Sequence, residues 1–394
     1  MDTKMIIGFD AKRIVSNGTG LGSYGRTLVN DLARRDEDMA LHLYAPTPGR
    51  DDLQEQIIKS ENIRFCYPGN QSLTSQRLRV GAPAGILLPL TSNYWRTKGI
   101  VKDLKRDGIA LYHGLSGELP IGIRKSGIKS VVTIHDLIFL RHPEFYHWVD
   151  TKIYAWKFRQ AIREADRIIA ISECTKRDIM ELGGVDENRI ALIYQSYAPR
   201  FKTETDKGKQ TEVSQRYQLP KRYMLSVGTI EARKNILLAV KALPHLPEDL
   251  GLVMVGRHTA YTDQVISYAE KQGLSQRIHV LHGVPDEDLP ALYGMAETFV
   301  YPSRYEGFGI PIIEAIKCGL PVVACTGSCL EEAGGPDCLY VDPDDAEAMA
   351  NAIRKTLHDA EGREQRIARS QDYIRRFEGN DVAGQIVDLY QSLL

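Results

Sequence analysis

Two glutamates, Glu306 and Glu314, bracket a glycine-rich turn in the segment SRYEGFGIPIIEAIKCGLPVV. Carboxylates accept hydrogen bonds from sugar hydroxyls, whereas the backbone N–H groups at the start of a helix bind anions. A turn with backbone donors in its middle and a carboxylate at each end therefore suits a nucleotide-sugar, which has an anionic diphosphate between two hydroxyl-rich rings. An ordinary turn with two surface glutamates is the alternative that this stretch alone leaves open.

The elements that must position this turn can be read from its flanks. The apolar run at residues 298–301 predicts a buried strand before the turn. Pro311 suits the first position of a helix, and Gly319 suits the position just after its end. Pro321 begins a second apolar strand. The turn is therefore expected at the carboxyl end of a strand and the amino end of a helix, where open α/β sheets bind ligands.

Two adjacent cations, Arg233 and Lys234, follow another predicted strand at residues 223–228, in the turn TIEARKN. Arginine offers a bidentate fork and lysine a point charge to a diphosphate. A basic pair at a helix start is unfavourable beside the positive end of the helix dipole. We therefore favour an anion-binding role over a solvated helix start.

An apolar run at residues 131–135 ends in His135, which is followed directly by Asp136. The carboxyl ends of parallel strands form the ligand-binding edge of a sheet. A single histidine in this position is more often structural than catalytic, so these residues alone leave its role open.

Three glycines, Gly20, Gly22 and Gly25, match the pattern G-x-G-x-x-G after a predicted strand at residues 5–9. They lie about ten residues past the strand, and no acidic residue ends the next strand, which argues against a dinucleotide site. We expect a loop over residues 17–25 that is either flexible or brings the backbone close to a ligand, and then an amphipathic helix.

The composition restricts the class of protein. A chain of 394 residues that is 43% hydrophobic and 26% charged indicates a soluble globular protein of two domains. A net charge of -1 gives no electrostatic argument for nucleic-acid binding. The six cysteines include no CxxC pair, and no histidines cluster at zinc spacing, so we expect no metal site and a reducing, cytoplasmic environment.

Three further segments need interpretation, and two of them allow an alternative. Residues 77–98 combine apolar, basic and aromatic residues, which suits either a membrane-surface patch or, as we favour, a buried or acceptor-lining loop. The predicted helix at 151–165 is expected to bury a face that includes Tyr154 and Phe158 in the core. Residues 286–288 form a DxD pattern, which we interpret as helix capping rather than metal binding.

The Glu–x7–Glu spacing in EGFGIPIIEA resembles the signature of retaining glycosyltransferases of family 4, which have the GT-B fold. The resemblance implies an α/β protein of two Rossmann-like, doubly wound parallel-sheet domains facing a cleft. It places Glu306 near the hydroxyls of the donor sugar and Glu314 on the ribose. The backbone of Phe308, Gly309 and Ile310 would meet the sugar and the diphosphate.

Two more segments share this resemblance, SVGTIEARKN and HDLIFLRHPEFY. The first implies that Arg233 and Lys234 neutralise the leaving diphosphate. The second implies that His135 lies beside the transferring sugar. A glycine-rich loop faces the donor phosphates in the family, which carries that role over to Gly20 and Gly22.

The stretch that holds Gly283 and Val284 corresponds to the family's nucleobase-binding segment. The chain departs from the family at three positions. Thr229 stands where many members have arginine, and Ala232 stands where some subgroups have proline, which leaves the donor base open. Glu378 stands where many relatives have tryptophan, which weakens the expected crossover of the last helix.

Alternating strand and helix patterns on both sides of a polar stretch, residues 200–218, predict the domain organisation. We expect an acceptor-binding domain over 1–200 and a nucleotide-sugar-binding domain over 201–375. The resemblance implies that a last helix, within 376–394, crosses back to the first domain.

The resemblance implies a metal-independent, cofactor-free transfer of a hexose with retention of configuration. The EARKN turn is most similar to bacterial mannosyltransferases of polysaccharide and lipopolysaccharide assembly, which favours GDP-mannose, and UDP-sugars are the alternative. The acceptor would be a glycan or lipid-linked glycan at the cytoplasmic face, with peripheral membrane association left open. A phosphorylase or epimerase of the same fold, or a non-catalytic nucleotide-sugar-binding protein, are the remaining alternatives.

Overall fold

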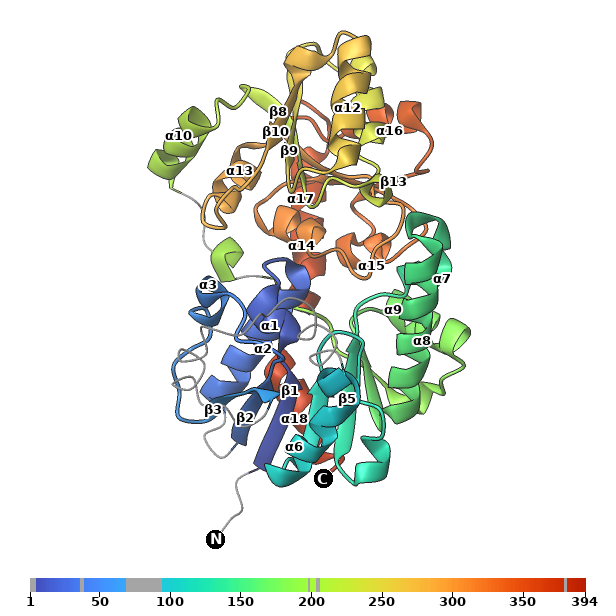
Figure 1. Cartoon of the computed structure of the whole chain (residues 1–394). Coiled ribbons are helices and arrows are strands. Elements are labelled where there is room, and N and C mark those ends of the chain that lie inside the picture. The colour runs from blue at the N-terminus through green and yellow to red at the C-terminus, as the bar shows by residue number, and fades with distance from the viewer. Residues whose placement is uncertain (1–4, 36–38, 69–93, 198, 203–205, 379–380) are drawn as a thin grey trace, which may run out of the picture. The chain divides into compact units, whose positions relative to one another are not determined.

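The computed structural model shows two compact units, each built around its own parallel sheet (Figure 1). The first unit comprises residues 1–171, 175–194 and 381–394, and the second comprises residues 172–174 and 195–380. The structure describes residues 5–35, 39–68, 94–197, 199–202, 206–378 and 381–394.

The first unit contains, within the described residues, a seven-stranded sheet of order β3-β2-β1-β4-β5-β6-β7. All its strand pairs are parallel. Its strands are β1 (Met5–Asp10), β2 (Met39–Tyr44), β3 (Ile63–Cys66), β4 (Leu111–Gly114), β5 (Lys129–Ile134), β6 (Arg167–Ala170) and β7 (Ile190–Leu192). Its α-helices are α1 (Lys12–Ser16), α2 (Gly20–Arg35), α3 (Asp51–Gln54), α6 (Ile100–Arg106), α7 (Ile138–Arg141), α8 (Trp148–Glu164), most of α9 (Glu173–Gly183) and α18 (Val382–Gln391). Short π or 3-10 helices cover Trp95–Gly99, Arg124–Ser126, Pro143–Phe145 and Glu187–Arg189.

The second unit contains, in the part of the chain that is described, a six-stranded parallel sheet of order β10-β9-β8-β11-β12-β13. Its strands are β8 (Arg222–Val227), β9 (Leu250–Val255), β10 (Ile278–Leu281), β11 (Thr298–Tyr301), β12 (Val322–Cys325) and β13 (Leu339–Val341). Its α-helices are α10 (Lys207–Arg216), α11 (Leu237–Ala242), α12 (Ala260–Lys271), α13 (Leu289–Met295), α14 (Ile310–Lys317), α15 (Leu330–Gly334), α16 (Ala346–Arg354) and α17 (Arg363–Ile374). Its 3-10 helices are Pro199–Lys202, Ala232–Lys234, Leu243–His245, Ser275–Arg277 and Arg375–Phe377.

Both sheets run third, second, first, fourth, fifth, sixth strand in chain order, which is the doubly wound arrangement of Rossmann-like domains. The prediction of two such sheets is confirmed. In this arrangement the strand order reverses beside the first strand of each sheet, so ligands are expected at the carboxyl ends of β1 and β4, and of β8 and β11.

The last helix, α18, packs against α2 in the core of the first unit, and Figure 1 shows it in red among the blue and green elements. Tyr390 on α18 is fully buried, and its hydroxyl lies 2.6 Å from Nδ1 of His113 at the end of β4. The other ring nitrogen of His113 lies 2.8 Å from the hydroxyl of Thr133 on β5. Burial lowers the pKa of His113 to about 3, so the imidazole is neutral and acts as a structural link.

The prediction of a loop over residues 17–25 is wrong, because α2 already begins at Gly20. A Cβ on Gly22 would lie 1.8 Å from the carbonyl oxygen of Asn17 and 2.8 Å from that of Arg13. Glycine is required here so that the start of α2 can pack against the preceding turn. Gly20, in contrast, is exposed, with no atom within 4 Å of a Cβ at that position.

The polar stretch at 200–218 contains α10. No helix was predicted there, because the stretch lacks apolar periodicity. Asp288 explains how this polar helix is held, because its fully buried carboxylate pairs with Lys209 (2.7 Å) and Arg216 (2.6 Å) and accepts a hydrogen bond from Tyr217 (2.7 Å). Asp288 stands at the N-cap position of α13, as the sequence predicted, but its side chain makes no capping hydrogen bond to that helix.

The segment considered as a membrane-surface patch lies mostly outside the described residues, which resume at Tyr94. Its described end forms the π-helix Trp95–Gly99, in which Trp95 is buried. None of the described helices is both long enough and apolar enough to cross a bilayer.

Candidate active site

Three charged side chains meet at the carboxyl edge of the second sheet. Glu306 lies in the turn between β11 and α14, whereas Arg233 and Lys234 lie in the 3-10 turn after β8. Because β8 and β11 are parallel neighbours, their carboxyl ends meet. One oxygen of Glu306 lies 2.5 Å from Nζ of Lys234, and the other lies 2.9 Å from Nη1 of Arg233. Two motifs that are far apart in the sequence thus form one ionic cluster.

This cluster is charged at any physiological pH. Burial raises the pKa of Glu306, but the charges of Lys234 and Arg233 outweigh burial and hold the pKa at about 2. Burial acts to lower the pKa of both cations, yet Glu306 keeps each of them above its ordinary value. The carboxylate therefore holds two cations in place in a buried site.

Both cations have further partners that fix their orientation. Arg233 donates to Oε1 of Glu231 (2.7 Å) and to the carbonyl of Tyr305 (2.7 Å). Lys234 donates to the hydroxyl of Tyr301 (2.6 Å). Among the described residues Lys234 thus has two hydrogen-bond partners, Glu306 and Tyr301, and its third N–H bond is left for a ligand.

The turn before α14 has the geometry that its glycines suggested. Gly309 adopts φ +116°, a conformation that favours glycine, and precedes the first residue of α14, Ile310. Phe308 is buried and packs edge-on against Phe377, with 5.3 Å between the ring centroids. The thiol of Cys329 donates to the carbonyl of Phe308 at 2.8 Å. In the first turn of α14, Pro311 has no N–H, and the N–H of Ile312 donates to the carbonyl of Gly309 at 2.9 Å. The N–H of Ile310 is therefore the group that this fixed turn presents.

Glu314 lies on α14 in a different electrostatic environment from Glu306. It is 8% exposed, and burial raises its pKa to about 7, although Arg200 and a hydrogen bond from Tyr293 (3.3 Å) oppose the rise. The carboxyl group therefore changes its protonation near neutral pH. Because a protonated carboxyl loses part of its acceptor capacity, this group can bind hydroxyls in a pH-dependent way.

Val284 lies half-buried in the loop after β10, directly after Gly283, which has φ +63°. This loop is at the same sheet edge as the ionic cluster, with β9 between β10 and β8. Asp286 of the loop pairs with Arg200 at 3.0 Å, and the charge of Arg200 also acts on Glu314. The structure places Val284 and Glu314 on the same edge as the cluster, but it records no direct contact of either with Glu306.

His135 lies in the first unit at the end of β5. Its Nε2 donates to the carbonyl of Leu115 at 2.9 Å, and the edge of Tyr24 contacts the ring at a centroid distance of 4.9 Å. Burial lowers the pKa of His135 to about 4, so the ring is neutral at pH 7. A neutral, oriented imidazole can position a hydroxyl group, but it carries no charge with which to neutralise a phosphate.

His135 lines a cavity of about 250 Å³ in the first unit. The lining also includes Tyr154 of α8, whose ring lies 5.7 Å from that of Phe139 and 6.2 Å from that of Tyr146. The sequence placed Tyr154 in the core, but it is 40% exposed, because α8 turns Phe158 rather than Tyr154 fully inward. Aromatic rings beside hydrogen-bonding groups are typical of a small-molecule site, and the motif HDLIFLRHPEFY was the signal for this one.

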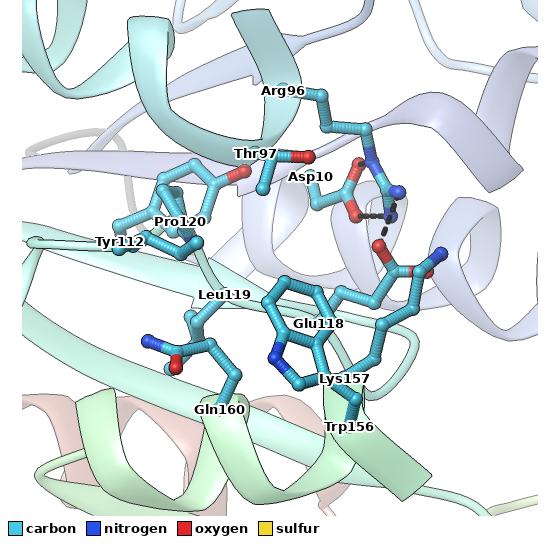
Figure 2. Close-up of a pocket in the computed structure, with 11 residues that line it drawn as sticks. Asp10, Arg96, Thr97, Tyr112, Glu118, Leu119, Pro120, Trp156, Lys157 and Gln160 are labelled. Carbon is cyan, nitrogen blue, oxygen red and sulfur yellow. Dashed lines mark hydrogen bonds and ion pairs between the residues drawn. The ribbon is translucent and has the colours of Figure 1, made fainter. Parts of the chain in front are cut away.

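A second cluster that the sequence did not indicate lies at the carboxyl end of β1 (Figure 2). Arg96 lies between Asp10 and Glu118 and is 2.5 Å from a carboxylate oxygen of each. Lys157 of α8 extends the chain of charges, 3.1 Å from the other oxygen of Glu118. Figure 2 shows Trp156 beside Lys157. The cluster links the π-helix before α6 and the middle of α8 to the end of β1.

One group of metal-ligand types occurs among the described residues, namely His42, Cys66 and Asp107 in the first unit, with ligand atoms within 4.8 Å of one another. Asp107 already accepts hydrogen bonds from Tyr44 (2.8 Å) and Arg106 (3.0 Å). These partners occupy both oxygens of the carboxylate, and the group does not include any residue assigned to the donor.

The family to which the chain belongs follows from comparison with known proteins. A family model described as "Glycosyl transferases group 1" matches residues 209–373, and a model described as "Glycosyltransferase Family 4" matches residues 18–197. O-antigen chain mannosyltransferase B of Escherichia coli is 31% identical over 385 residues, which cover 95% of this chain and 96% of the relative. The chain belongs to the group 1 glycosyltransferase family.

This glycosyltransferase is also similar to other mannosyltransferases in sequence and to solved glycosyltransferase structures in fold. The serotype-specific mannosyltransferase WbdA of Escherichia coli is 28% identical over 267 residues, which cover 64% of this chain and only 32% of that protein. The structure of HepE from Anabaena in complex with UDP and glucose has a TM-score of 0.73 at 18% identity, covering 99% of this chain and 100% of the other. Such similarities identify the fold as GT-B.

Proposed function

We propose that this glycosyltransferase transfers mannose from GDP-mannose to a glycan or lipid-linked glycan, with retention of configuration and without a metal ion. The names of its relatives support mannose as the sugar and an O-antigen-type chain as the acceptor. A nucleotide-sugar donor is also consistent with the UDP and UDP-glucose complexes of structural neighbours, although those carry a different base.

One observation carries the proposal, namely the pairing of Glu306 with Arg233 and Lys234 at the carboxyl edge of the second sheet. When the bond between the sugar C1 and the phosphate oxygen breaks, negative charge grows on the leaving diphosphate and positive charge on the sugar. The two cations and the N–H of Ile310 at the start of α14 would stabilise the diphosphate, and the ionised Glu306 would stabilise the sugar cation.

The state of Glu306 also supports retention by attack on a single face of the sugar. Its pKa of about 2 and its two charge-assisted hydrogen bonds make the carboxylate a weak nucleophile. A double displacement through Glu306 is therefore unfavourable. We propose instead that the acceptor hydroxyl approaches the face from which the diphosphate leaves, so that a phosphate oxygen accepts its proton.

We propose that the nucleoside is held by Glu314 at the ribose and by the loop of Val284 at the base. In the first unit, the aromatic cavity of about 250 Å³ would hold a terminal sugar of the acceptor, with His135 orienting a hydroxyl group. Its lining includes Arg13, Asp136 and Lys157, which can hydrogen-bond to hydroxyl groups.

The direct test is transfer from radiolabelled GDP-mannose, UDP-glucose and UDP-GlcNAc to a lipid-linked glycan extract, each with and without EDTA, followed by NMR of the product anomer. We expect mannose transfer that EDTA does not change and an α-linked product from the α-linked donor. Lys234→Ala should lower kcat about 100-fold, as the loss of a transition-state donor does.

Lys221→Ala, which removes an exposed lysine from the same unit, is the matched control and should leave kcat unchanged. Transfer from UDP-sugars alone would overturn the choice of donor. An inverted product would overturn the proposed stereochemistry, and loss of activity in EDTA that Mg²⁺ restores would overturn metal independence.

A further inference from the structure

Large apolar side chains gather on the solvent side of α8. Of the nine exposed large hydrophobic side chains recorded among the described residues, five belong to this helix. Trp148 is 63% exposed, Trp156 51% and Ile153 45%. The chain has three tryptophans in all, and the third, Trp95, is buried. Exposed tryptophans concentrated on one helix indicate an interaction surface rather than chance exposure.

The opposite side of α8 explains why these residues point outward. Ala155, Phe158, Ala161 and Ile162 are buried in the core of the first unit. With 3.6 residues per turn, Trp156 and Ile153 fall opposite this buried stripe, whereas Trp148, the first residue of the helix, falls beside its edge. The helix therefore has two apolar sides, one buried in the core and one exposed, which we call the outer face.

The outer face also carries positive charge. Lys152, Arg159 and Arg163 are exposed and fall between the two tryptophans on the helical wheel. Nζ of Lys152 lies 4.8 Å from the centroid of the Trp148 ring. The outer face therefore consists of Trp148, Val149, Lys152, Ile153, Trp156, Arg159 and Arg163.

The two carboxylates of α8 lie away from these cations. Glu164 accepts hydrogen bonds from the backbone of Gly122 (3.0 Å) and Arg124 (3.1 Å), so its charge is turned toward a neighbouring segment. Asp150 lies about 200° around the helix from Trp148. The outer face, as described, thus combines aromatic rings with three cations and no carboxylate.

We infer that the outer face of α8 docks on an anionic lipid surface. Tryptophan and the long stems of lysine and arginine suit the boundary between water and hydrocarbon, where the apolar part is buried and the polar end stays wet. A helix with this composition lies in the plane of the interface, and its cations are attracted to anionic headgroups. No ion pair of these three cations is recorded among the described residues, which favours this occupant over an apolar protein surface.

The same helix links this surface to the acceptor cavity. Tyr154 and Lys157 of α8 line the cavity of about 250 Å³, while Trp156 borders the cluster in Figure 2. A lipid surface on the outer face would hold the cavity next to the headgroup region, where a lipid-linked acceptor presents its sugars. This link, unlike the surface itself, rests on the proposed function.

The test is co-sedimentation of the full-length protein with vesicles of phosphatidylcholine containing 30% phosphatidylglycerol, and with vesicles of phosphatidylcholine alone, without nucleotide or glycan. We expect binding to the anionic vesicles that weakens strongly between 0.05 and 0.5 M salt. Each cation removed should weaken binding about fivefold. The triple variant Lys152→Gln, Arg159→Gln, Arg163→Gln should therefore lose about 100-fold.

A matched control replaces three exposed lysines of the second unit, Lys207, Lys221 and Lys271, with glutamine and should bind like the wild type. Trp148→Ala with Trp156→Ala should also weaken binding and should abolish the quenching of tryptophan fluorescence by brominated lipid. Unchanged melting temperatures would show that the variants are folded.

Equal vesicle binding by the wild type and the triple cation variant would overturn the inference. So would an absence of vesicle binding together with a dimer, seen by sedimentation velocity, that the tryptophan variant disrupts, because the outer face would then join two copies of the chain. The measurement uses no donor or acceptor, so failure here leaves the proposed transfer reaction untouched, and failure of transfer leaves the lipid surface untouched.

Discussion

Replacing Glu306 with glutamine should destabilise the free protein and at the same time increase its response to a nucleotide diphosphate. The side chain keeps its shape but loses its charge, so Arg233 and Lys234 stay close together in a buried site without their carboxylate. The cations hold the pKa of Glu306 at about 2, against an ordinary value of 4.5. That shift corresponds to about 3 kcal/mol of interaction between the carboxylate and its surroundings.

We therefore expect Glu306→Gln to lower the free energy of unfolding at pH 7 by about 3 kcal/mol, which agrees with the usual cost of removing one partner from a buried ion pair. Because the folded-state pKa is depressed, the contribution of Glu306 is present above about pH 4.5 and is lost as the pH falls through about 2. The difference between wild type and variant should shrink accordingly in acid.

The assay is urea unfolding followed by circular dichroism, with and without GDP at a saturating concentration. A diphosphate bound to the two cations would replace the missing charge, so GDP should stabilise the variant more than it stabilises the wild type. Glu248→Gln, which changes an exposed glutamate of the same unit, serves as the control and should behave like the wild type. An unfolding free energy unchanged by Glu306→Gln, or equal GDP shifts in both proteins, would refute this account of the cluster.

Three other predictions follow from particular contacts. GDP affinity, measured by isothermal titration, should fall below about pH 7 as Glu314 becomes protonated, and Glu314→Gln should remove this pH dependence. Because burial raises the pKa of Glu314, this group should also stabilise the free protein below about pH 4.5. That stabilisation should be lost as the pH rises through about 7. Asp10→Ala should lower the free energy of unfolding in urea by about 3–5 kcal/mol, because it leaves Arg96 buried with one carboxylate fewer. Adding Arg96→Met should recover part of this loss. A decrease below about 1 kcal/mol would contradict a structural role for the pair. Gly309→Ala should destabilise the protein by about 1–3 kcal/mol and abolish GDP binding, because φ is +116° and a Cβ would lie 3.2 Å from Ala333. The control is Gly319→Ala, where φ is +74° and no atom would lie nearer than 3.8 Å to the Cβ, and it should leave GDP affinity intact.

The sequence was informative where chemistry is local. Strand ends, glycine positions and the flanking proline placed the turn of Gly309 at a helix start, and the same reasoning placed Arg233 and Lys234 after a strand. That Glu306 would pair with both cations could not be predicted from spacing. The pairing requires β8 and β11 to be neighbours in the sheet, which only the strand order shows.

The features that the sequence did not predict depend on contacts between distant parts of the chain, or on residue patterns that fit two structural roles. Arg96 pairs with Asp10 across 86 positions of the chain, and neither residue has a local signal. Asp288 stands at the N-cap of α13, as the sequence predicted, but its carboxylate pairs with α10 instead of the backbone of α13. The amphipathic pattern of α8 placed Tyr154 with Phe158 on one buried face, but Tyr154 is 40% exposed. The predicted helix also began at residue 151 and so left out Trp148, where α8 starts.

The thiol of Cys329 allows opening of the turn between β11 and α14 to be measured in solution. It donates to the carbonyls of Glu306 (3.1 Å) and Phe308 (2.8 Å), it is fully buried, and burial raises its pKa well above the ordinary value. A thiol in this state reacts with an alkylating reagent only when the surrounding structure opens. The alkylation rate of Cys329, measured by mass spectrometry of the labelled peptide, would therefore report how often the turn opens, and a bound nucleotide that closes the turn should slow it.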